Sequence, residues 1–316
     1  MGYRFKLLEI LIVVCLVLLS AFTYNQVKYS EQIPKSTNTV KKFHIAVVSD
    51  HIESYSADRF LKGVETASEN SDCVYELYNL QDYDMESLSK ILSATEVDGA
   101  VINLENNVTA SILIEKLREA GIVILTAGND APESGREIYI GTNKYNLGKQ
   151  AALLAVEATG KSGNIAVILG SEYESTQSPS GNNFLNGIYE TYSDRALYKL
   201  TEVRYSKDER AEIIIDELLK GRSPLNAVIC TDPLDAIRVT RVLVDRNMVG
   251  NIKIIASGDP PEILDAIQKD LIYASVVEDY QELGELSVTN LLKSLEGESV
   301  SSYINIPIET LSKEIK

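Results

Sequence analysis

Short apolar runs alternate with stretches of helical length along most of the chain. The runs are rich in Val, Ile and Ala and cover residues 45–48, 75–80, 100–103, 122–125, 138–140, 165–169, 227–230, 252–256 and 274–277. Between them, core-facing positions recur with helical spacing, as at 88, 91, 92 and 95 and at 211, 214, 215 and 218. Such an alternation predicts an α/β protein whose parallel sheets are covered by helices on both faces.

The N-terminal segment has a different pattern. Arg4 and Lys6 precede an apolar run over residues 7–22, and as a helix this run would be about 24 Å long, slightly short of a bilayer core of about 30 Å. A cleaved signal peptide and an uncleaved anchor both fit such a run. Leu19 stands where a cleavage site needs a small residue, and Cys15 lies mid-run without a lipoprotein pattern. We favour a single-pass membrane anchor over residues 1–24, with the binding domain outside the cytoplasm because the positive flank precedes the run.

The rest of the chain divides into a stalk and a folded part. Residues 25–42 are polar and lack a periodic apolar pattern, so we predict a stalk there. A chain of 316 residues exceeds a single typical core, which predicts two lobes in the remaining 43–312. We expect lobe 1 over about 43–141 plus 279–300 and lobe 2 over about 142–278 plus 301–312.

Charge and motifs exclude several function classes. A net charge of −16 repels phosphate backbones, so we expect no nucleic-acid partner. Cys15, Cys73 and Cys230 show neither disulfide nor zinc spacing. No motif for a nucleophile elbow, a phosphate loop or a dinucleotide site is present, and this predicts a protein that is not an enzyme and uses neither cofactor nor metal.

One stretch, Ile122–Gly148, links the two expected lobes. A buried strand is followed by a polar turn with Asn129 and Asp130, then by a short strand that runs through Gly141 into a helix. The carboxyl end of a parallel strand is where open α/β sheets bind ligands. The run T-x-x-N-D-x-P-x-S-x-R-x-x-Y-I-G-T-N, from Thr126 to Asn143, resembles the periplasmic sugar-binding proteins of the ribose, galactose and xylose type, whose ligand domain is shared with lactose-repressor-like regulators.

The resemblance extends over about residues 43 to 310. It implies the type I periplasmic-binding-protein fold, with two Rossmann-like lobes joined by three crossovers near Gly141, Glu278 and Ser301. A cleft between lobes on flexible crossovers can close around a small ligand.

The resemblance also implies a set of ligand contacts at strand ends in the first lobe. The candidates are Ser49, Asp50, Glu53, Tyr55, Asn103, Asn129 and Asp130. Tyr55 fits an aromatic place of the family, where a ring stacks on the sugar, whereas Ser56 or Ala57 stands in the second aromatic place. Asn103 matches the family's asparagine.

The second lobe adds further candidates. They are Phe184, Tyr205, Thr231, Asp232, Asp259 and Glu278. Thr231 replaces an amide of the family's Asn-Asp pair, Asp259 lies one residue past the family's aspartate, and Glu278 matches a family glutamine. Phe184 stands where sugar binders have an arginine that grips ring oxygens with its planar fork.

Two interpretations of Tyr205 are open. Residues 206–209, Ser-Lys-Asp-Glu, form a capping box that predicts a helix start there and puts Tyr205 at a strand end. Stacking on a ligand and packing at a lobe rim both fit this position.

The hypothesis for function is a membrane-anchored extracytoplasmic solute-binding protein. We expect a small neutral or cationic polar ligand, a sugar or polyol, whose binding is signalled to a membrane partner such as a sensor histidine kinase. The alternative is the substrate-binding component of a sugar ABC transporter, with a permease as the partner. A cytoplasmic regulator would need a basic helix-turn-helix where residues 1–42 have an apolar span and a stalk, and an enzyme that uses Asp50 and Glu53 has no supporting motif.

Overall fold

The structure is a computed structural model that describes residues 42–50, 52–160, 162–170, 182–193, 195, 198–206, 210–221 and 223–313. The expected anchor, and the expected stalk apart from Lys42, lie outside the described residues. Within the described ranges, no helix has the length and apolar character needed to cross a membrane.

The first lobe is built on a six-stranded parallel sheet. Its order is β11 (Tyr303–Asn305), β5 (Ile138–Gly141), β4 (Val123–Ala127), β3 (Gly99–Asn103), β1 (Phe43–Ser49) and β2 (Cys73–Asn79). The helices are α2 (Tyr55–Glu69), η1 (Leu80–Asp82), α3 (Met85–Ala94), α4 (Asn107–Glu119) and α10 (Tyr280–Leu295).

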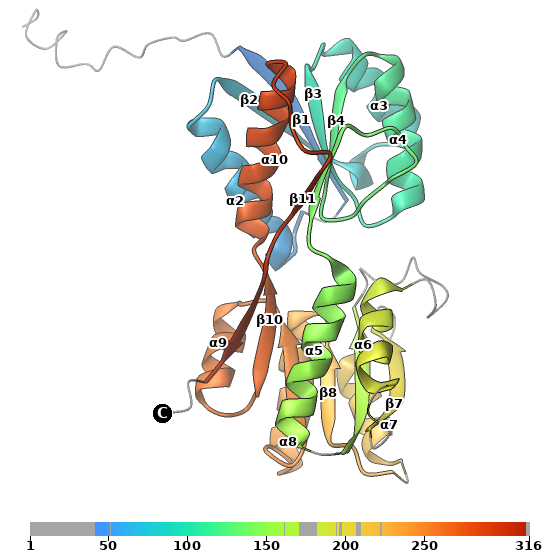
Figure 1. The fold of residues 1–316 in the computed structure, drawn as a ribbon, viewed down its shortest axis with the longest axis vertical. Helices are drawn as coiled ribbons and strands as arrows, with labels where there is room; N and C mark the ends of the chain where they lie inside the picture. Colours follow the sequence, from blue (N-terminus) through green and yellow to red (C-terminus); the bar gives the residue numbers. More distant parts are fainter. Residues whose placement is uncertain are drawn as a thin grey trace, which may run out of the picture. The chain divides into compact units, whose positions relative to one another are not determined.

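Alternation along β1 divides the core of this lobe into two layers. Ile45 and Val47 pack with the apolar faces of α2 and α10, whereas Ala46 and Val48 pack with α3 and α4. Figure 1 shows the two helix pairs on opposite faces of the sheet. A strand buried on both faces needs apolar residues at every position, which is why these strands lack a polar alternation.

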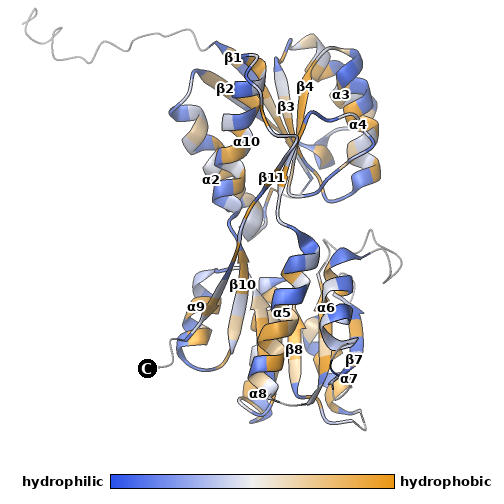
Figure 2. Ribbon diagram, in the orientation of Figure 1, coloured by the Kyte–Doolittle hydropathy of each residue, from blue (hydrophilic) through white to orange (hydrophobic). Residues whose placement is uncertain are grey.

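The second lobe repeats this architecture. Its sheet has the order β12 (Ile308–Ser312), β10 (Ala274–Glu278), β9 (Lys253–Ser257), β8 (Ala227–Cys230), β6 (Gly163–Leu169) and β7 (Tyr198–Tyr205), and β12 is antiparallel to β10. The helices are α5 (Lys144–Thr159), α6 (Asn183–Ser193), α7 (Ala211–Leu219), α8 (Pro233–Asp245) and α9 (Pro261–Gln268). One core layer joins the sheet to α5 and α6, and the other joins it to α7, α8 and α9. Figure 2 shows apolar residues on the strands and on the helices of this lobe.

Glycines set the closest helix contact in each lobe. A Cβ on Gly63 of α2 would lie 2.0 Å from the carbonyl oxygen of Gln281, and one on Gly284 of α10 would lie 2.1 Å from that of Phe60. In the second lobe, a Cβ on Gly148 of α5 or on Gly187 of α6 would meet the facing backbone at 1.9 and 2.0 Å. Each pair of helices can touch only because these side chains are absent.

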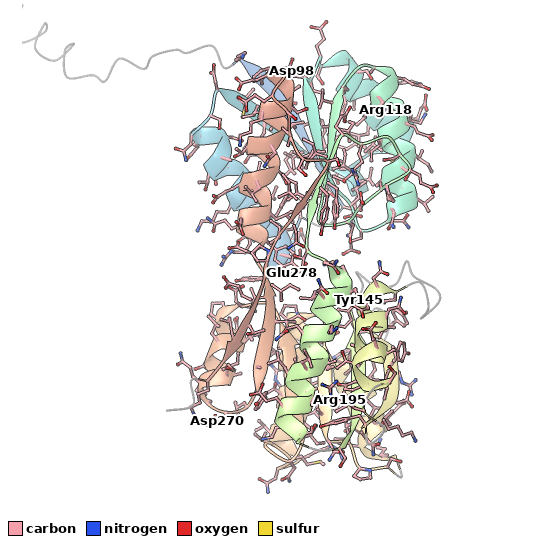
Figure 3. All side chains as sticks on the ribbon, viewed as in Figure 1. Asp98, Arg118, Tyr145, Arg195, Asp270 and Glu278 are labelled. Atoms are coloured by element: carbon pink, nitrogen blue, oxygen red, sulfur yellow. The ribbon has the colours of Figure 1, made fainter. Side chains whose placement is uncertain are left out.

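The prediction of an α/β fold with two lobes is confirmed. The crossovers at Gly141 and Glu278 lie where the sequence placed them, and Glu278, labelled in Figure 3, is the last residue of β10 before the chain passes to α10. The third crossover is later than the predicted Ser301, because β11 belongs to the first sheet and the chain reaches the second sheet only at Ile308. Strands of three and five residues at a sheet edge carry too little apolar pattern to be found from sequence.

Two further predictions are corrected. The strand β7 ends at Tyr205 but was missing from the predicted apolar runs, because its eight residues are only partly buried and include Lys199, Glu202 and Arg204. Helix α7 does not begin in the capping box, since its N-cap is Arg210, which makes no side-chain capping bond.

Candidate functional site

Amide side chains mark the strand ends of the first lobe. Asn103, at the end of β3, accepts a hydrogen bond from Ser49 Oγ at 3.4 Å and donates from Nδ2 to the carbonyl of Ala127 at 3.0 Å. Asn129 donates from Nδ2 to the carbonyl of Leu104 at 3.4 Å. These bonds tie the ends of β1, β3 and β4 together, and they leave each half-buried amide with further hydrogen-bonding capacity.

Asp130 lies in an ion pair inside this lobe. Both of its oxygens accept from Arg136, one from Nε and one from Nη2 at 2.8 Å, and the guanidinium lies 5.6 Å from the centre of the Tyr139 ring. Burial, followed by the Asp130 charge, raises the pKa of Tyr139, so its hydroxyl stays protonated and donates to the carbonyl of Gly128 at 3.2 Å. The carboxylate of Asp130 therefore holds the turn before the first crossover.

A small cavity of about 30 Å³ lies at the strand ends of the second lobe. It is lined by Lys144, Leu147, Thr231, Ser257, Gly258, Val276, Glu278 and Tyr280. Space of this size holds one or two water molecules. A larger polar ligand would therefore have to use the surrounding strand ends as well.

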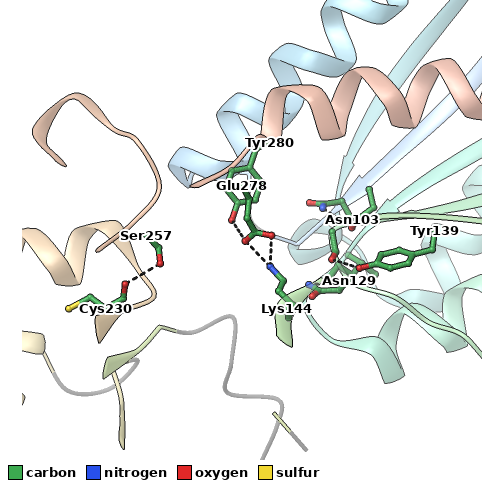
Figure 4. A network of polar contacts seen from close by, with 11 residues as sticks. Asn103, Asn129, Tyr139, Lys144, Cys230, Ser257, Glu278 and Tyr280 are labelled. Carbon is green, nitrogen blue, oxygen red and sulfur yellow. Dashed lines mark hydrogen bonds and ion pairs between the residues drawn. The ribbon is translucent and has the colours of Figure 1, made fainter. Parts of the chain in front are cut away.

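The charged part of this cavity is an ion pair at the crossovers. Lys144 Nζ lies 2.8 and 3.0 Å from the two oxygens of Glu278, and Tyr280 donates to Oε1 of the same carboxylate at 3.1 Å (Figure 4). The side chains of Lys144 and Glu278 are 25% and 12% exposed, so the pair is largely removed from water. Lys144 follows the first crossover and Glu278 precedes the second, which links the two segments electrostatically.

Thr231 and Asp232 serve the local backbone. Thr231 Oγ1 accepts from the buried Gly170 N–H at 2.8 Å. Asp232 is the N-cap of α8 and accepts from the N–H groups of Leu234 and Asp235 at 2.8 and 3.1 Å. An aspartate at this position satisfies helix N–H groups and complements the helix dipole.

Tyr55 and Asp259 bring the two lobes into contact. The Tyr55 hydroxyl donates to Asp259 Oδ1 at 3.0 Å, and Arg59 Nη1 lies 3.8 Å from Oδ2 of the same carboxylate. Burial and then the bond to Asp259 raise the pKa of Tyr55, so this phenol is a donor at neutral pH. The pair joins the start of α2 to the turn after β9.

The other candidates occupy different surroundings. Asp50 Oδ2 accepts from the Glu105 N–H at 2.9 Å, whereas Glu53 is exposed. Phe184 is 1% exposed and packs in the core between α5 and α6, because its backbone lies against Gly148. Tyr205 packs at the edge of the same core layer.

Sequence reasoning missed four polar residues of this region: Arg59, Lys144, Ser257 and Tyr280. Lys144 is the first residue of α5, where a basic side chain is unfavourable beside the positive end of the helix dipole. This unfavourable position is a signal that could have identified Lys144. Among the described residues, no group of three or more His, Cys, Asp or Glu side chains is arranged to hold a metal ion.

Two α/β lobes joined by three crossovers, with polar strand ends beside the crossovers, define a two-lobed protein of the type I periplasmic-binding-protein fold. A family model described as periplasmic binding protein domain matches residues 45–299, and the chain belongs to this family. A comparison with curated proteins found no match.

Solved structures support the assignment of the fold. A glucose-galactose binding protein, GanP, from Geobacillus stearothermophilus is 23% identical with a TM-score of 0.76, covering 86% of this chain and 98% of its own. A solute-binding protein from Burkholderia graminis, solved with D-arabinose, is 22% identical with a TM-score of 0.77, covering 87% and 96%. A XylFII–LytSN complex contains a chain that is 23% identical with a TM-score of 0.73, covering 86% and 98%.

Proposed function

We propose that this chain is an extracytoplasmic solute-binding protein that holds a neutral sugar or polyol at the strand ends of its two lobes. The observation that carries the proposal is that carboxylates at the strand ends already have partners within the chain. Asp130 pairs with Arg136 and Glu278 with Lys144, while Asp50, Asp232 and Asp259 accept hydrogen bonds from N–H or O–H donors of the chain.

These internal partners of the carboxylates limit the kind of ligand that the strand ends can bind. A cationic ligand such as an amino sugar or a polyamine would have to compete with Lys144 or Arg136 for a carboxylate. A hydroxyl group can instead use the lone pairs and N–H groups that remain free on amides such as Asn103. The amides of the first lobe and the hydroxyls of Thr231 and Ser257 thus suit a ligand that both donates and accepts.

The comparisons support a sugar as the ligand. Solved relatives of this fold include a glucose-galactose binding protein and solute-binding proteins solved with D-arabinose and with D-allose. Their low identity leaves the particular sugar to experiment.

The test is a thermal-shift screen of the full chain purified in detergent. The panel contains D-glucose, D-galactose, D-arabinose, D-allose, D-ribose, D-xylose and polyols, with glucosamine and spermidine as cations and glucuronate as an anion. A ligand at one hundred times its Kd stabilises the folded state by about 2.7 kcal/mol, which is readily detected as a rise in Tm. We expect at least one neutral compound, and none of the charged ones, to raise Tm.

Asn103→Ala tests the placement of the site. It removes an amide at the end of β3 and should weaken binding of the best sugar at least about tenfold by calorimetry. Asn251→Ala, at an exposed position in the second lobe, is the matched control and should bind as the unaltered protein does. Stabilisation by spermidine alone, or equal binding by both variants, would contradict the proposal.

We further propose that ligand binding is signalled to a membrane partner. The apolar N-terminal run and the polar stalk support a protein that stays beside a membrane. The XylFII–LytSN complex shows that one relative of this fold assembles with a second protein. Uptake is the other candidate, because a similar structure is described as a sugar ABC transporter sugar-binding protein from Bacillus halodurans.

Co-purification of the full-length protein from detergent-solubilised membranes distinguishes the two roles. A histidine kinase recovered with the protein, in an amount that changes on adding the sugar, would support signalling. Recovery of a permease with its ATPase would support uptake. N-terminal sequencing that showed cleavage after Ala21 or Thr23 would remove the main support for signalling.

A further inference from the structure

Arg59 lies on the first lobe beside the contact between the lobes. It follows Tyr55 by one helical turn on α2, so the two side chains share a face of the helix. Arg59 Nη1 donates to the Tyr55 hydroxyl at 3.4 Å and lies 3.8 Å from Asp259 Oδ2. Both distances exceed those of a well-formed charge-assisted hydrogen bond, about 2.7–2.9 Å.

The N–H donors of the Arg59 guanidinium have few acceptors among the described residues. Arginine has five N–H donors in a rigid planar fork, and among the described residues Arg59 makes one hydrogen bond, of 3.4 Å. Its Nε is buried and has no acceptor in the described part of the chain. A buried donor without an acceptor destabilises the protein, so an oxygen that reaches Nε would complete the site.

The surroundings decide which oxygen that is. Asp259 lies beside the guanidinium and is adjacent to Gly258, which lines the cavity of the second lobe. A carboxylate at this position disfavours an anionic ligand and can accept a hydrogen bond from a hydroxyl group. Tyr55, held protonated, donates its hydrogen to Asp259 and accepts from Arg59 only at the long distance of 3.4 Å, and its ring offers an apolar face.

From this geometry we propose that Arg59 is a ligand-gripping, specificity-determining residue. Its Nε and Nη groups bind two adjacent oxygens of a neutral polyhydroxylated ring, while Asp259 accepts a hydroxyl of the same ligand. A planar fork recognises a pair of oxygens at fixed spacing, which a point charge does not. The inference rests on the proposed function, since it names the residue that reads the ligand of that site.

The test compares binding of the best sugar from the screen with binding of its single-deoxy analogues. Calorimetry is done on the unaltered full chain and on Arg59→Gln, Arg59→Lys and the control Arg241→Gln, an exposed arginine on α8. We expect Arg59→Gln to weaken binding at least about tenfold and Arg59→Lys to weaken it nearly as much, because lysine keeps the charge without the fork. Arg241→Gln should change binding by less than about twofold.

The deoxy analogues separate a direct contact from an indirect one. If Arg59 touches the ligand, one deoxy analogue should bind the unaltered protein at least about tenfold more weakly, and this difference should fall to about twofold on Arg59→Gln. If the deoxy analogue binds Arg59→Gln as much more weakly than the parent sugar as it does the unaltered protein, Arg59 acts only by holding Tyr55 and Asp259. That result, or tight binding by both variants, overturns the inference while the proposed function stands.

A failure of the proposed function has a different signature. In that case no sugar or polyol binds the unaltered protein, and the inference falls with it. The melting temperature of each unliganded variant is measured in parallel. Arg59→Lys keeps the charge beside Asp259 and provides a folded second variant if Arg59→Gln is unstable.

Discussion

In the first lobe α2 and α10 meet at Gly63 and Gly284, and in the second lobe α5 and α6 meet at Gly148 and Gly187. The same solution appears twice because the two helices of each pair lie side by side on one face of a parallel sheet, and their close approach requires absent side chains. The strand ends differ. The first lobe combines the amides of Asn103 and Asn129 with the Asp130–Arg136 ion pair, whereas the second has the Lys144–Glu278 ion pair and the Asp232 cap and no such amides among the candidates.

This difference teaches where the chain is constrained. Packing between helices and sheet allows few alternatives, so the two cores share one design. Side chains at the ends of the strands do not fill the core between sheet and helices, so they can vary with the ligand. Substitutions in the two cores should therefore have similar effects, and substitutions at the two sets of strand ends should not.

The largest effect is expected at the glycine pairs. Gly284→Val and Gly187→Val would each place a side chain about 2 Å from a backbone carbonyl, and overpacking of this kind lowers the free energy of unfolding by about 3 kcal/mol. Urea denaturation followed by circular dichroism measures the loss. Gly163→Ala is the control, because its Cβ would meet neighbours at ordinary distances of 3.4 Å and more. A loss in one lobe only would break the comparison between the cores.

Much of this duplicated fold was predictable from the sequence. Continuous apolar runs such as 45–48 and 227–230 identified central strands, since a strand covered on both faces excludes polar residues. The edge strand β7 was missed because it mixes charged and apolar residues, and β11 and β12 were missed because they have only three and five residues. Their place depends on pairing partners far away in sequence, which local pattern does not contain.

The next largest effect is expected at the ion pair of the second lobe. Lys144→Met would leave Glu278 largely buried without its cation. Breaking a fully buried pair costs about 3–5 kcal/mol, and the residual exposure of this pair reduces our expectation to about 2 kcal/mol. Lys149→Met, on the same helix in an exposed pair with Glu190, should cost less than about 0.5 kcal/mol.

A double variant sharpens this test. Lys144→Met combined with Glu278→Gln removes both charges, so most of the loss in unfolding free energy should be recovered. Equal losses in the single and double variants would show that Lys144 stabilises the lobe through packing alone.

A pH-dependent effect of intermediate size is expected at Asp235 in the second lobe. Burial is the main cause that raises the pKa of this carboxyl above its ordinary value of 3.8, and Asp232 adds to it. Well below pH 3.8 Asp235 is protonated whether the chain is folded or unfolded. As the pH rises, the unfolded chain loses its proton first, so a penalty on the folded state grows until the folded pKa has been passed.

Asp235→Asn removes this titration. Its free energy of unfolding relative to the unaltered protein should increase between pH 4 and pH 7, by about 1.4 kcal/mol for each unit by which the folded pKa is raised. Denaturation at a series of pH values measures the difference. Asp265→Asn, at an exposed position on α9, should give a much flatter profile, and a decrease with pH for Asp235→Asn would contradict the assignment.

The candidate site was less predictable than the fold. Ser49 and Asn103 were both chosen because they end strands. They lie within hydrogen-bonding distance of each other, because parallel strands end at one edge of the sheet. Strand-end position did not reveal that Phe184 is buried or that Asp130 is held by Arg136, since both facts depend on which helix or turn packs against them. Lys144 and Arg59 were missed because a basic side chain in a helix has no sequence signature of its partner across the fold.

The smallest effect compares one strand-end hydroxyl in each lobe. Thr231→Val keeps the shape of the side chain but removes the oxygen that accepts from Gly170, and a buried N–H left without a partner should lower the free energy of unfolding by about 1 kcal/mol. Ser49→Ala removes a hydroxyl whose bond to Asn103 is 3.4 Å long, while Asn103 keeps its bond to Ala127, so the loss should be about 0.5 kcal/mol or less. Chemical denaturation of both variants measures the difference. Thr231 accepts a hydrogen bond from a backbone N–H group, whereas Ser49 only orients the Asn103 side chain. A larger loss of unfolding free energy for Ser49→Ala would therefore show that the first lobe, not the second, depends on its strand-end hydroxyl.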